Sequence, residues 1–106
     1  MGKVVVLQQD VTDLLENLIG ILFEKGYFGF EEFAQIYVSK IYDFIEFDLV
    51  NFPPKRTPHK LRRYGSKYVF YQANSHTTWY IFFENRGERY LITYVTNNHM
   101  ENVKFL

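Results

Sequence analysis

The feature that most constrains the fold is a change in the spacing of apolar residues at about residue 65. Before it, apolar side chains recur every three or four residues, which is typical of amphipathic helices. After it, they alternate or run continuously through segments rich in tyrosine, phenylalanine, valine and threonine, which is typical of strands. A stretch containing Pro53, Pro54 and Pro58 separates the two parts, and we expect it to have no regular structure. This order predicts an α+β fold.

The first part predicts one strand and two helices. Residues 3–9 are β-branched and apolar, end at Asp10, and predict a first strand. A helix is expected from Val11 to about Gly26, and a second from about Phe30 to Leu49. The linker at 27–29 is short enough to make the pair an antiparallel helical hairpin. The face of the second helix expected to be buried comprises Phe30, Phe33, Ala34, Tyr37, Ile41, Phe44 and Ile45.

The second part predicts a three-stranded antiparallel meander packed on the helices. Its strands are expected at residues 67–73, 77–84 and 89–96. Gly87 can take positive φ in the second turn, and we expect Glu84 to face Arg89 across that hairpin. Both alternating sets of the middle strand are apolar or aromatic, so alternation does not say which set faces the helices. The two sets are Trp79, Ile81 and Phe83, and Tyr80 and Phe82.

Composition limits what the chain can be. Its 106 residues are the common size of one domain and support one core, so residues 1–106 are expected to form a single domain. The absence of cysteine excludes disulfides and thiolate zinc sites and is typical of the cytoplasm. No apolar run is long enough for a membrane span. The three histidines lack metal-binding spacing, so we expect no metal and no other cofactor.

Charge is unevenly distributed along a chain whose net charge is zero. Residues 1–50 carry three Lys/Arg and nine Asp/Glu, and residues 51–106 carry nine Lys/Arg and three Asp/Glu. Six of the cations fall between residues 55 and 67, where there is no acid: Lys55, Arg56, Lys60, Arg62, Arg63 and Lys67. Such a segment creates a local positive potential. It either binds an anionic partner or forms a solvated loop.

The layout of a strand, a helical hairpin, a basic loop and a meander resembles that of the RelE/ParE superfamily of toxins from bacterial toxin–antitoxin modules. The likeness in layout covers nearly the whole chain. Its most specific stretch is residues 61–71, Leu-Arg-Arg-Tyr-Gly-Ser-Lys-Tyr-Val-Phe-Tyr, where a leucine and a glycine precede a basic and aromatic strand. The resemblance implies a toxin with a small antitoxin protein as its partner.

In the ribosome-dependent RNases of that superfamily, cations and a proton donor cut mRNA without a metal. Carried over by position, the resemblance implies catalytic roles for Arg62, Arg63, Arg89 and His99, with His99 as the proton donor. It implies RNA contacts for Lys55, Arg56, Lys60, Lys67 and Tyr71. A histidine suits proton donation because its ordinary pKa lies near neutrality, and cations stabilise charge that develops on a phosphate.

Two alternatives stay open. The ParE branch of the superfamily inhibits DNA gyrase and needs no RNase residues. A non-catalytic interaction module of the same fold would act on neither mRNA nor gyrase. Aromatic residues make up 20% of the chain. Some of them must lie at the surface, where they would stack on bases, contact an antitoxin or form a homodimer.

Overall fold

The helices form where the apolar spacing predicts them. The computed structural model describes residues 3–26, 30–100 and 106, so the linker expected at 27–29 lies outside the described residues. Helix α1 spans Gln9–Glu24 and α2 spans Glu31–Asp43. Helix α2 continues through a π-helical turn, η1, at Phe44–Asp48 and a 3₁₀ turn, η2, at Leu49–Asn51. The helical path therefore ends just before Pro53, as the proline rule predicts.

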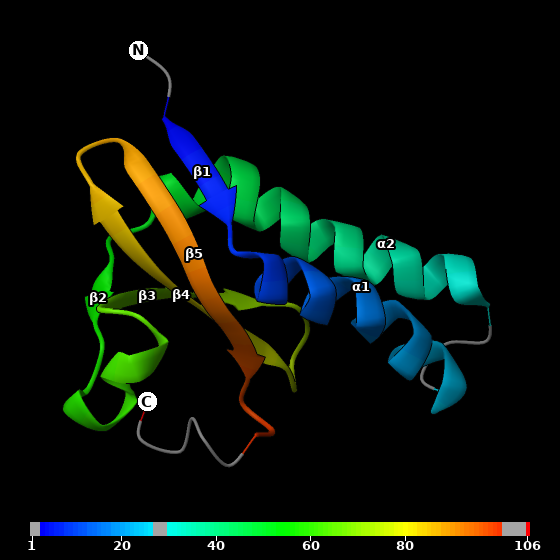
Figure 1. The fold of residues 1–106 in the computed structure, drawn as a ribbon. Coiled ribbons are helices and arrows are strands. Elements are labelled where there is room, and N and C mark those ends of the chain that lie inside the picture. The colour runs from blue at the N-terminus through cyan, green and yellow to red at the C-terminus, as the bar shows by residue number, and fades with distance from the viewer. Residues whose placement is uncertain (1–2, 27–29, 101–105) are drawn as a thin grey trace.

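The sheet has five strands instead of the three that the sequence predicts. Its order is β1-β5-β4-β3-β2, and the meander β3-β4-β5 is antiparallel throughout. The first strand pairs in parallel with the last, as Figure 1 shows, so it is part of the same sheet. The strands are β1 at Val4–Leu7, β2 at Lys55–Arg56, β3 at Lys67–Gln72, β4 at Thr78–Arg86 and β5 at Arg89–Asn97.

Strand β2 corrects the expectation that the proline-rich stretch has no regular structure. It consists of only Lys55 and Arg56, which pair with Tyr68 and Lys67 of β3. An edge position suits it because prolines on either side cannot donate to a sheet ladder. The chain then makes a 3₁₀ helix, η3, at His59–Tyr64 before it enters β3.

Helices α1 and α2 cover one face of the sheet, and this settles which set of residues in β4 is internal. Trp79, Ile81 and Phe83 belong to the core that the helices form with the sheet. The indole nitrogen of Trp79 donates a hydrogen bond of 2.9 Å to the hydroxyl of Tyr37 on α2. Figure 1 shows the helices on one side of the sheet and η3 on the other. No helix among the described residues is long and apolar enough to cross a membrane.

The buried face of α2 differs from the expected one. Val38 and Leu49 join Ala34, Ile41, Phe44 and Ile45 in the interior, whereas Phe30 and Phe33 are 63% and 52% exposed. The expected face was wrong in its first turn because the helix extends past the edge of the sheet there (Figure 1). Apolar side chains are therefore left at the surface around the first half of α2.

The hairpin between β4 and β5 also has a different register from the expected one. Arg86 lies opposite Arg89, and Glu84 lies opposite Leu91. Gly87 has a φ of 55°, as the turn requires. The prediction that Glu84 faces Arg89 was wrong because strand pairing continues two residues further along β4 than the alternation indicates.

Thr57, between β2 and η3, contains an unusual buried polar group. The residue is 1% exposed, and its hydroxyl has no hydrogen-bond partner within the part of the chain that the structure describes. A buried hydroxyl without a partner costs free energy, and replacing it by a methyl group of the same shape removes that cost.

We therefore expect Thr57→Val to raise the free energy of unfolding by about 1 kcal/mol. This corresponds to a rise of about 4 °C or more in the melting temperature of a domain of this size. Urea titration and thermal melting followed by circular dichroism measure both quantities, with Thr57→Ser as the control that keeps the hydroxyl. A less stable Thr57→Val protein would show that the hydroxyl is satisfied.

Candidate nucleic-acid interface

The face of the sheet away from the helices carries a connected cluster of five aromatic rings. Phe82 of β4 lies at its centre, fully buried, with ring centroids 5.7 Å from Tyr64, 5.7 Å from Tyr68 and 6.1 Å from Tyr94. Tyr80 joins the cluster through Tyr68, at 6.1 Å. We call this cluster the aromatic platform: Tyr64, Tyr68, Tyr80, Phe82 and Tyr94. Burial of Phe82 on this face shows that the tyrosines form a second packed layer.

A β-bulge places part of this layer. Phe82 pairs with Tyr94 and Phe83 pairs with Ile92, so Thr93 is an extra residue in β5. A bulge redirects the side chain of the extra residue. The Thr93 hydroxyl donates a hydrogen bond to the backbone carbonyl of Tyr64. The bulge therefore fastens the end of η3 to the centre of the sheet.

Gly65 makes this close approach possible. A Cβ atom at position 65 would lie 2.6 Å from the Thr93 hydroxyl oxygen and 3.0 Å from the Cβ of Phe82. Both distances are shorter than ordinary van der Waals contact, so only glycine fits between η3 and the sheet. The glycine that marked the resemblance in the sequence thus has a steric role here.

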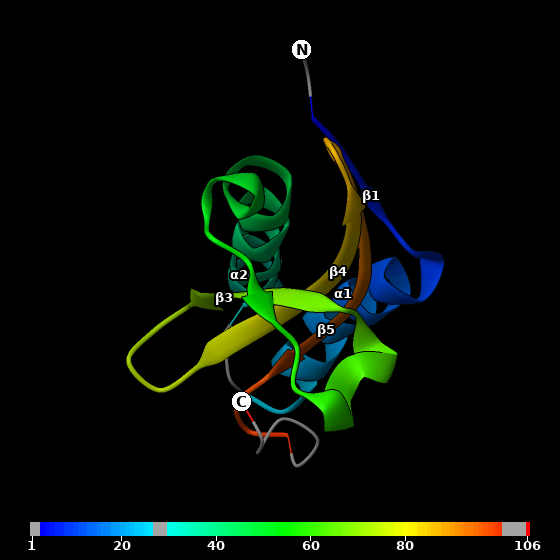
Figure 2. The same cartoon turned by 90° about the vertical axis from the view of Figure 1, so that its left-hand side faces the viewer.

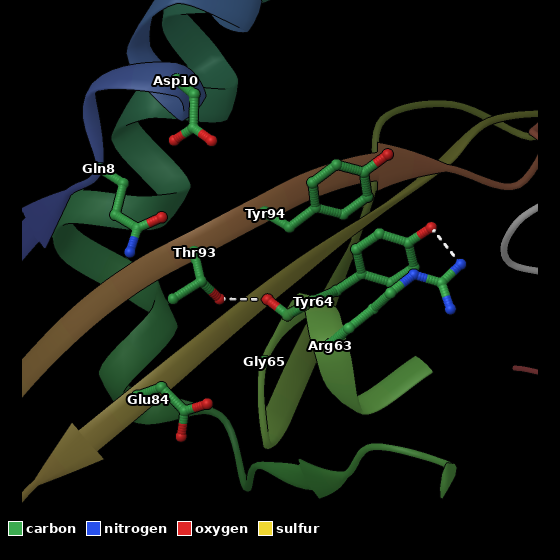
Figure 3. Close-up of a pocket in the computed structure, with 8 residues that line it drawn as sticks. All are labelled: Gln8, Asp10, Arg63, Tyr64, Gly65, Glu84, Thr93 and Tyr94. Carbon is green, nitrogen blue, oxygen red and sulfur yellow. Dashed lines mark hydrogen bonds between the residues drawn. The ribbon is translucent and has the colours of Figure 1, made fainter. Parts of the chain in front are cut away.

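Arg63 and two tyrosines form a stack at the edge of the platform. The rings of Tyr64 and Tyr94 are nearly parallel, with centroids 4.2 Å apart and 14° between their planes. The Arg63 guanidinium lies over the Tyr64 ring at 4.6 Å and donates a hydrogen bond of 3.0 Å to the Tyr64 hydroxyl. Figure 3 shows this stack. A second hydrogen bond from Arg63, to the Lys60 carbonyl, fixes the guanidinium further.

Three further cations of the segment, Lys55, Lys60 and Arg62, lie near the platform on β2 and η3. Lys60 and Arg62 are exposed on η3, and Arg62 donates a long hydrogen bond of 3.4 Å to the Thr57 carbonyl. The Lys55 ammonium lies 5.8 Å from the centre of the Phe70 ring on this same face of the sheet. In Figure 2, which is seen from the side of β2 and η3, these elements lie in front of the sheet. Cations are thus placed around exposed aromatic surface.

Glu84 anchors the point where the segment enters the sheet. Its carboxylate accepts hydrogen bonds from the backbone nitrogen of Ser66, at 2.9 Å, and from the Ser66 hydroxyl. The Ser66 carbonyl in turn accepts the Thr57 backbone N–H at 3.1 Å. The connection from η3 to β3 is therefore held to β4 through Glu84 and to the end of β2 through Thr57.

Three residues expected to contact RNA lie on the other face of the sheet. Lys67 pairs with Phe83 and donates a hydrogen bond of 3.1 Å to the side chain of Asn85, and Tyr71 packs its ring 5.1 Å from that of Phe44. Burial, and then the neighbouring Tyr37, raise the pKa of Tyr71. Arg56 pairs with Lys67 and so shares its face of the sheet, although it is exposed. The aromatic platform and these three residues are on opposite faces.

Arg89 and His99 do not converge. Arg89 begins β5 and His99 follows its end, so the length of the strand, about 27 Å, separates them. Arg89 lies opposite Arg86 at the hairpin. The His99 imidazole lies 3.2 Å from the Thr77 hydroxyl, beside the start of β4. One phosphate cannot contact both side chains, so Arg89 and His99 cannot act together in one catalytic site, contrary to what the resemblance implies.

Tyr68 of the platform keeps its phenol proton at neutral pH. Burial, and then the neighbouring Tyr80, raise the pKa of Tyr68 above the ordinary tyrosine value. A protonated phenol offers a hydrogen-bond donor and an uncharged ring, and both suit contact with a nucleotide.

The structure adds a small polar cavity beside the platform that the sequence did not indicate. Its volume is about 290 Å³, and Gln8 and Asp10 line it together with Arg63, Thr93 and Tyr94 (Figure 3). The sequence does not indicate Gln8 and Asp10 because they lie about fifty residues from η3 in the chain and belong to no motif. In the sequence, Asp10 marks only the end of the first predicted strand.

Neither a metal site nor a comparison with known proteins assigns a function to the described part of the chain. Among residues 3–26, 30–100 and 106, no group of three or more histidines and acidic residues is close enough to hold a metal ion. Comparisons of the chain with protein-family models, with curated proteins and with solved structures find no match. The candidate site therefore rests on its own geometry.

Proposed function

We propose that this chain is the toxin of a bacterial toxin–antitoxin module and cleaves mRNA on the ribosome, in the cytoplasm, without a metal. The observation that carries the proposal is the Arg63–Tyr64–Tyr94 stack, with its 4.2 Å ring spacing, surrounded by the cations of η3. Aromatic rings bind splayed bases by stacking, and cations bind the phosphates between them. The order of a strand, two helices, a basic segment and a meander, on which the resemblance to RelE/ParE toxins rests, is present in the structure.

The chemistry of this proposal uses the 2′-hydroxyl of the RNA as the nucleophile. Its oxygen forms a bond to the adjacent phosphorus while the bond from phosphorus to the 5′-oxygen breaks, which leaves a 2′,3′-cyclic phosphate and a 5′-hydroxyl. The proton of the 2′-hydroxyl passes to water, and His99 protonates the departing 5′-oxygen. Arg62 and Arg63 stabilise the extra negative charge on the phosphate. Arg89 is too far along β5 to reach the phosphate that His99 serves.

An exposed apolar surface on the helices supports a protein partner. Phe33 and Ile36 of α2 are 52% and 50% exposed, and they line a cavity of about 400 Å³ with Tyr37 and Tyr71. An apolar surface of this kind suits a protein ligand. In the proposal that ligand is the small antitoxin. The same surface favours the second candidate, a gyrase inhibitor or a non-catalytic interaction module.

We expect the purified protein to stop cell-free translation and to leave cleaved message. Primer extension locates the cuts, and labelling with polynucleotide kinase detects the new 5′-hydroxyl ends. The same message without ribosomes is the control and should stay intact. Translation that continues at a protein concentration well above that of the ribosomes would overturn the proposal.

A DNA gyrase supercoiling assay separates the second candidate from the first. Inhibited supercoiling with uncut message would favour a gyrase inhibitor. Intact message, normal supercoiling and a specific protein partner would favour an interaction module.

A further inference from the structure

The polar cavity beside the aromatic platform combines groups from distant parts of the chain. Gln8 and Asp10 come from the junction of β1 and α1, Arg63 from the end of η3, and Thr93 and Tyr94 from the bulged part of β5. Among the described residues, neither the Gln8 amide nor the Asp10 carboxylate has a side-chain hydrogen-bond partner. In Figure 3 both side chains lie across the cavity from Tyr94. The cavity thus holds polar groups available to a ligand.

Charge indicates which part of a nucleotide suits this cavity. Two carboxylates, Asp10 and Glu84, line it, and they would repel a phosphate. Glu84 already accepts hydrogen bonds from Ser66, whereas Asp10 can accept two further hydrogen bonds. A ligand group that donates two adjacent hydrogen bonds and has no negative charge fits best. The backbone phosphates would remain outside the cavity, near the cations of η3.

Among the four RNA bases, guanine has this pattern. Its N1–H and N2–H groups are adjacent donors that a single carboxylate accepts together, and its O6 accepts a hydrogen bond that an amide such as that of Gln8 can donate. Adenine and cytosine each present one exocyclic amino group beside a ring acceptor, and uracil presents one donor between two acceptors. A ring of Tyr94 at the wall of the cavity suits contact with a flat base.

We infer that this cavity is a guanine-recognition pocket, in which Asp10 and Gln8 contact the Watson–Crick edge of a single unpaired base. The inference rests on the proposed function, because it assumes that RNA follows the aromatic platform. The inference goes beyond that function because it proposes that the site prefers RNA with guanine at one position. In this view the cations of η3 supply affinity, and Asp10 supplies discrimination among bases.

The test is the binding of short RNA to the intact chain. Four fluorescein-labelled hexamers carry guanosine, adenosine, cytidine or uridine at one position among uridines. Each has 2′-O-methyl groups, which block the nucleophile and prevent cleavage. Fluorescence anisotropy at low salt measures each dissociation constant. We expect the hexamer with guanosine to bind about tenfold or more tightly than the others, because one well-formed pair of hydrogen bonds to a base edge discriminates by this order.

Two matched variants assign the preference to the cavity. Asp10→Asn replaces one acceptor by a donor without changing size, and we expect it to reduce the preference for guanosine to within about twofold. Asp13→Asn removes the same charge from the same helix, and Asp13 is exposed as Asp10 is, but it accepts a hydrogen bond from Gln9 and does not line the cavity. It should keep the full preference. Circular dichroism checks that both variants remain folded.

The outcomes separate this inference from the proposed function. Equal binding of all four hexamers by the natural chain would overturn the guanine pocket and leave RNA binding by the platform intact. An unchanged preference in Asp10→Asn would also overturn it. Failure of every hexamer to bind would contradict both the pocket and the RNA-binding surface beneath it.

Discussion

Replacing Arg62 and Arg63 together by alanine is expected to abolish inhibition of cell-free translation, with a loss of a hundredfold or more. Each positioned donor that stabilises a transition state contributes about 10² to 10³ in rate. In the proposed site Arg63 would be such a donor, because the Tyr64 ring and the Lys60 carbonyl fix its guanidinium. Titrating the double variant against translation, with message cleavage followed by primer extension, measures the loss.

The matched control removes two cations from elsewhere on the surface. Lys3 and Lys25 are both exposed and lie outside the cationic segment. The variant Lys3→Ala with Lys25→Ala lowers the net charge by the same amount, and it should inhibit translation as the natural chain does. Equal losses in the two double variants would mean that only overall charge matters, which would contradict the site.

Phe82→Ala is expected to lower the free energy of unfolding by about 3 to 5 kcal/mol. The side chain of Phe82 is fully buried beneath the rings of Tyr64, Tyr68 and Tyr94, so truncation leaves a cavity under these three tyrosines. Urea titration measures the change. The near-UV circular dichroism of the tyrosines should also change, because the rings of Tyr64 and Tyr94 lose the surface against which they pack.

Phe70→Ala is the control for this prediction. Phe70 is the same residue type on the same face of the sheet, but it is 46% exposed. Its loss should cost about 1 kcal/mol, since less apolar area is involved. Similar costs for the two variants would show that the aromatic platform is not a packed layer.

Local signals in the sequence predict the elements but not the way they join. Gly26 has a φ of 74° at the end of α1, and Gly87 has a φ of 55° in the hairpin, as their places in the sequence indicate. The parallel pairing of β1 with β5 was not predicted, because the two strands are separated by most of the chain and nothing local records their contact. Strand β2 is too short to show any alternation.

Alternation failed in the middle of the sheet for a physical reason. Both Phe82 and Phe83 are buried, because tyrosines cover one face and helices cover the other. A strand covered on both faces has no polar side that would reveal its orientation. The bulge at Thr93 then shifts the pattern of β5 by one residue.

The candidate site was predicted in part. The sequence indicates the cationic segment and, as a class, aromatic residues at the surface, and the structure brings Arg63, Tyr64 and Tyr94 together. The positions of Lys67 and Tyr71 were not predictable, because successive residues of a strand point to opposite faces and the register was unknown. Gln8 and Asp10 join the site only through the pairing of β1 with β5, which no motif indicates.

The pairing of β1 with β5 bears on when the site comes into existence in a cell. A ribosome makes β1 before the other four strands, and β5, which lies between β1 and β4, is made last of the five. Until then Tyr64 has no Tyr94 to stack on and no Thr93 hydroxyl to hold its carbonyl. A chain released before this point would lack the stack and the cavity. The surface that we assign to RNA is therefore completed only after β5 has been made.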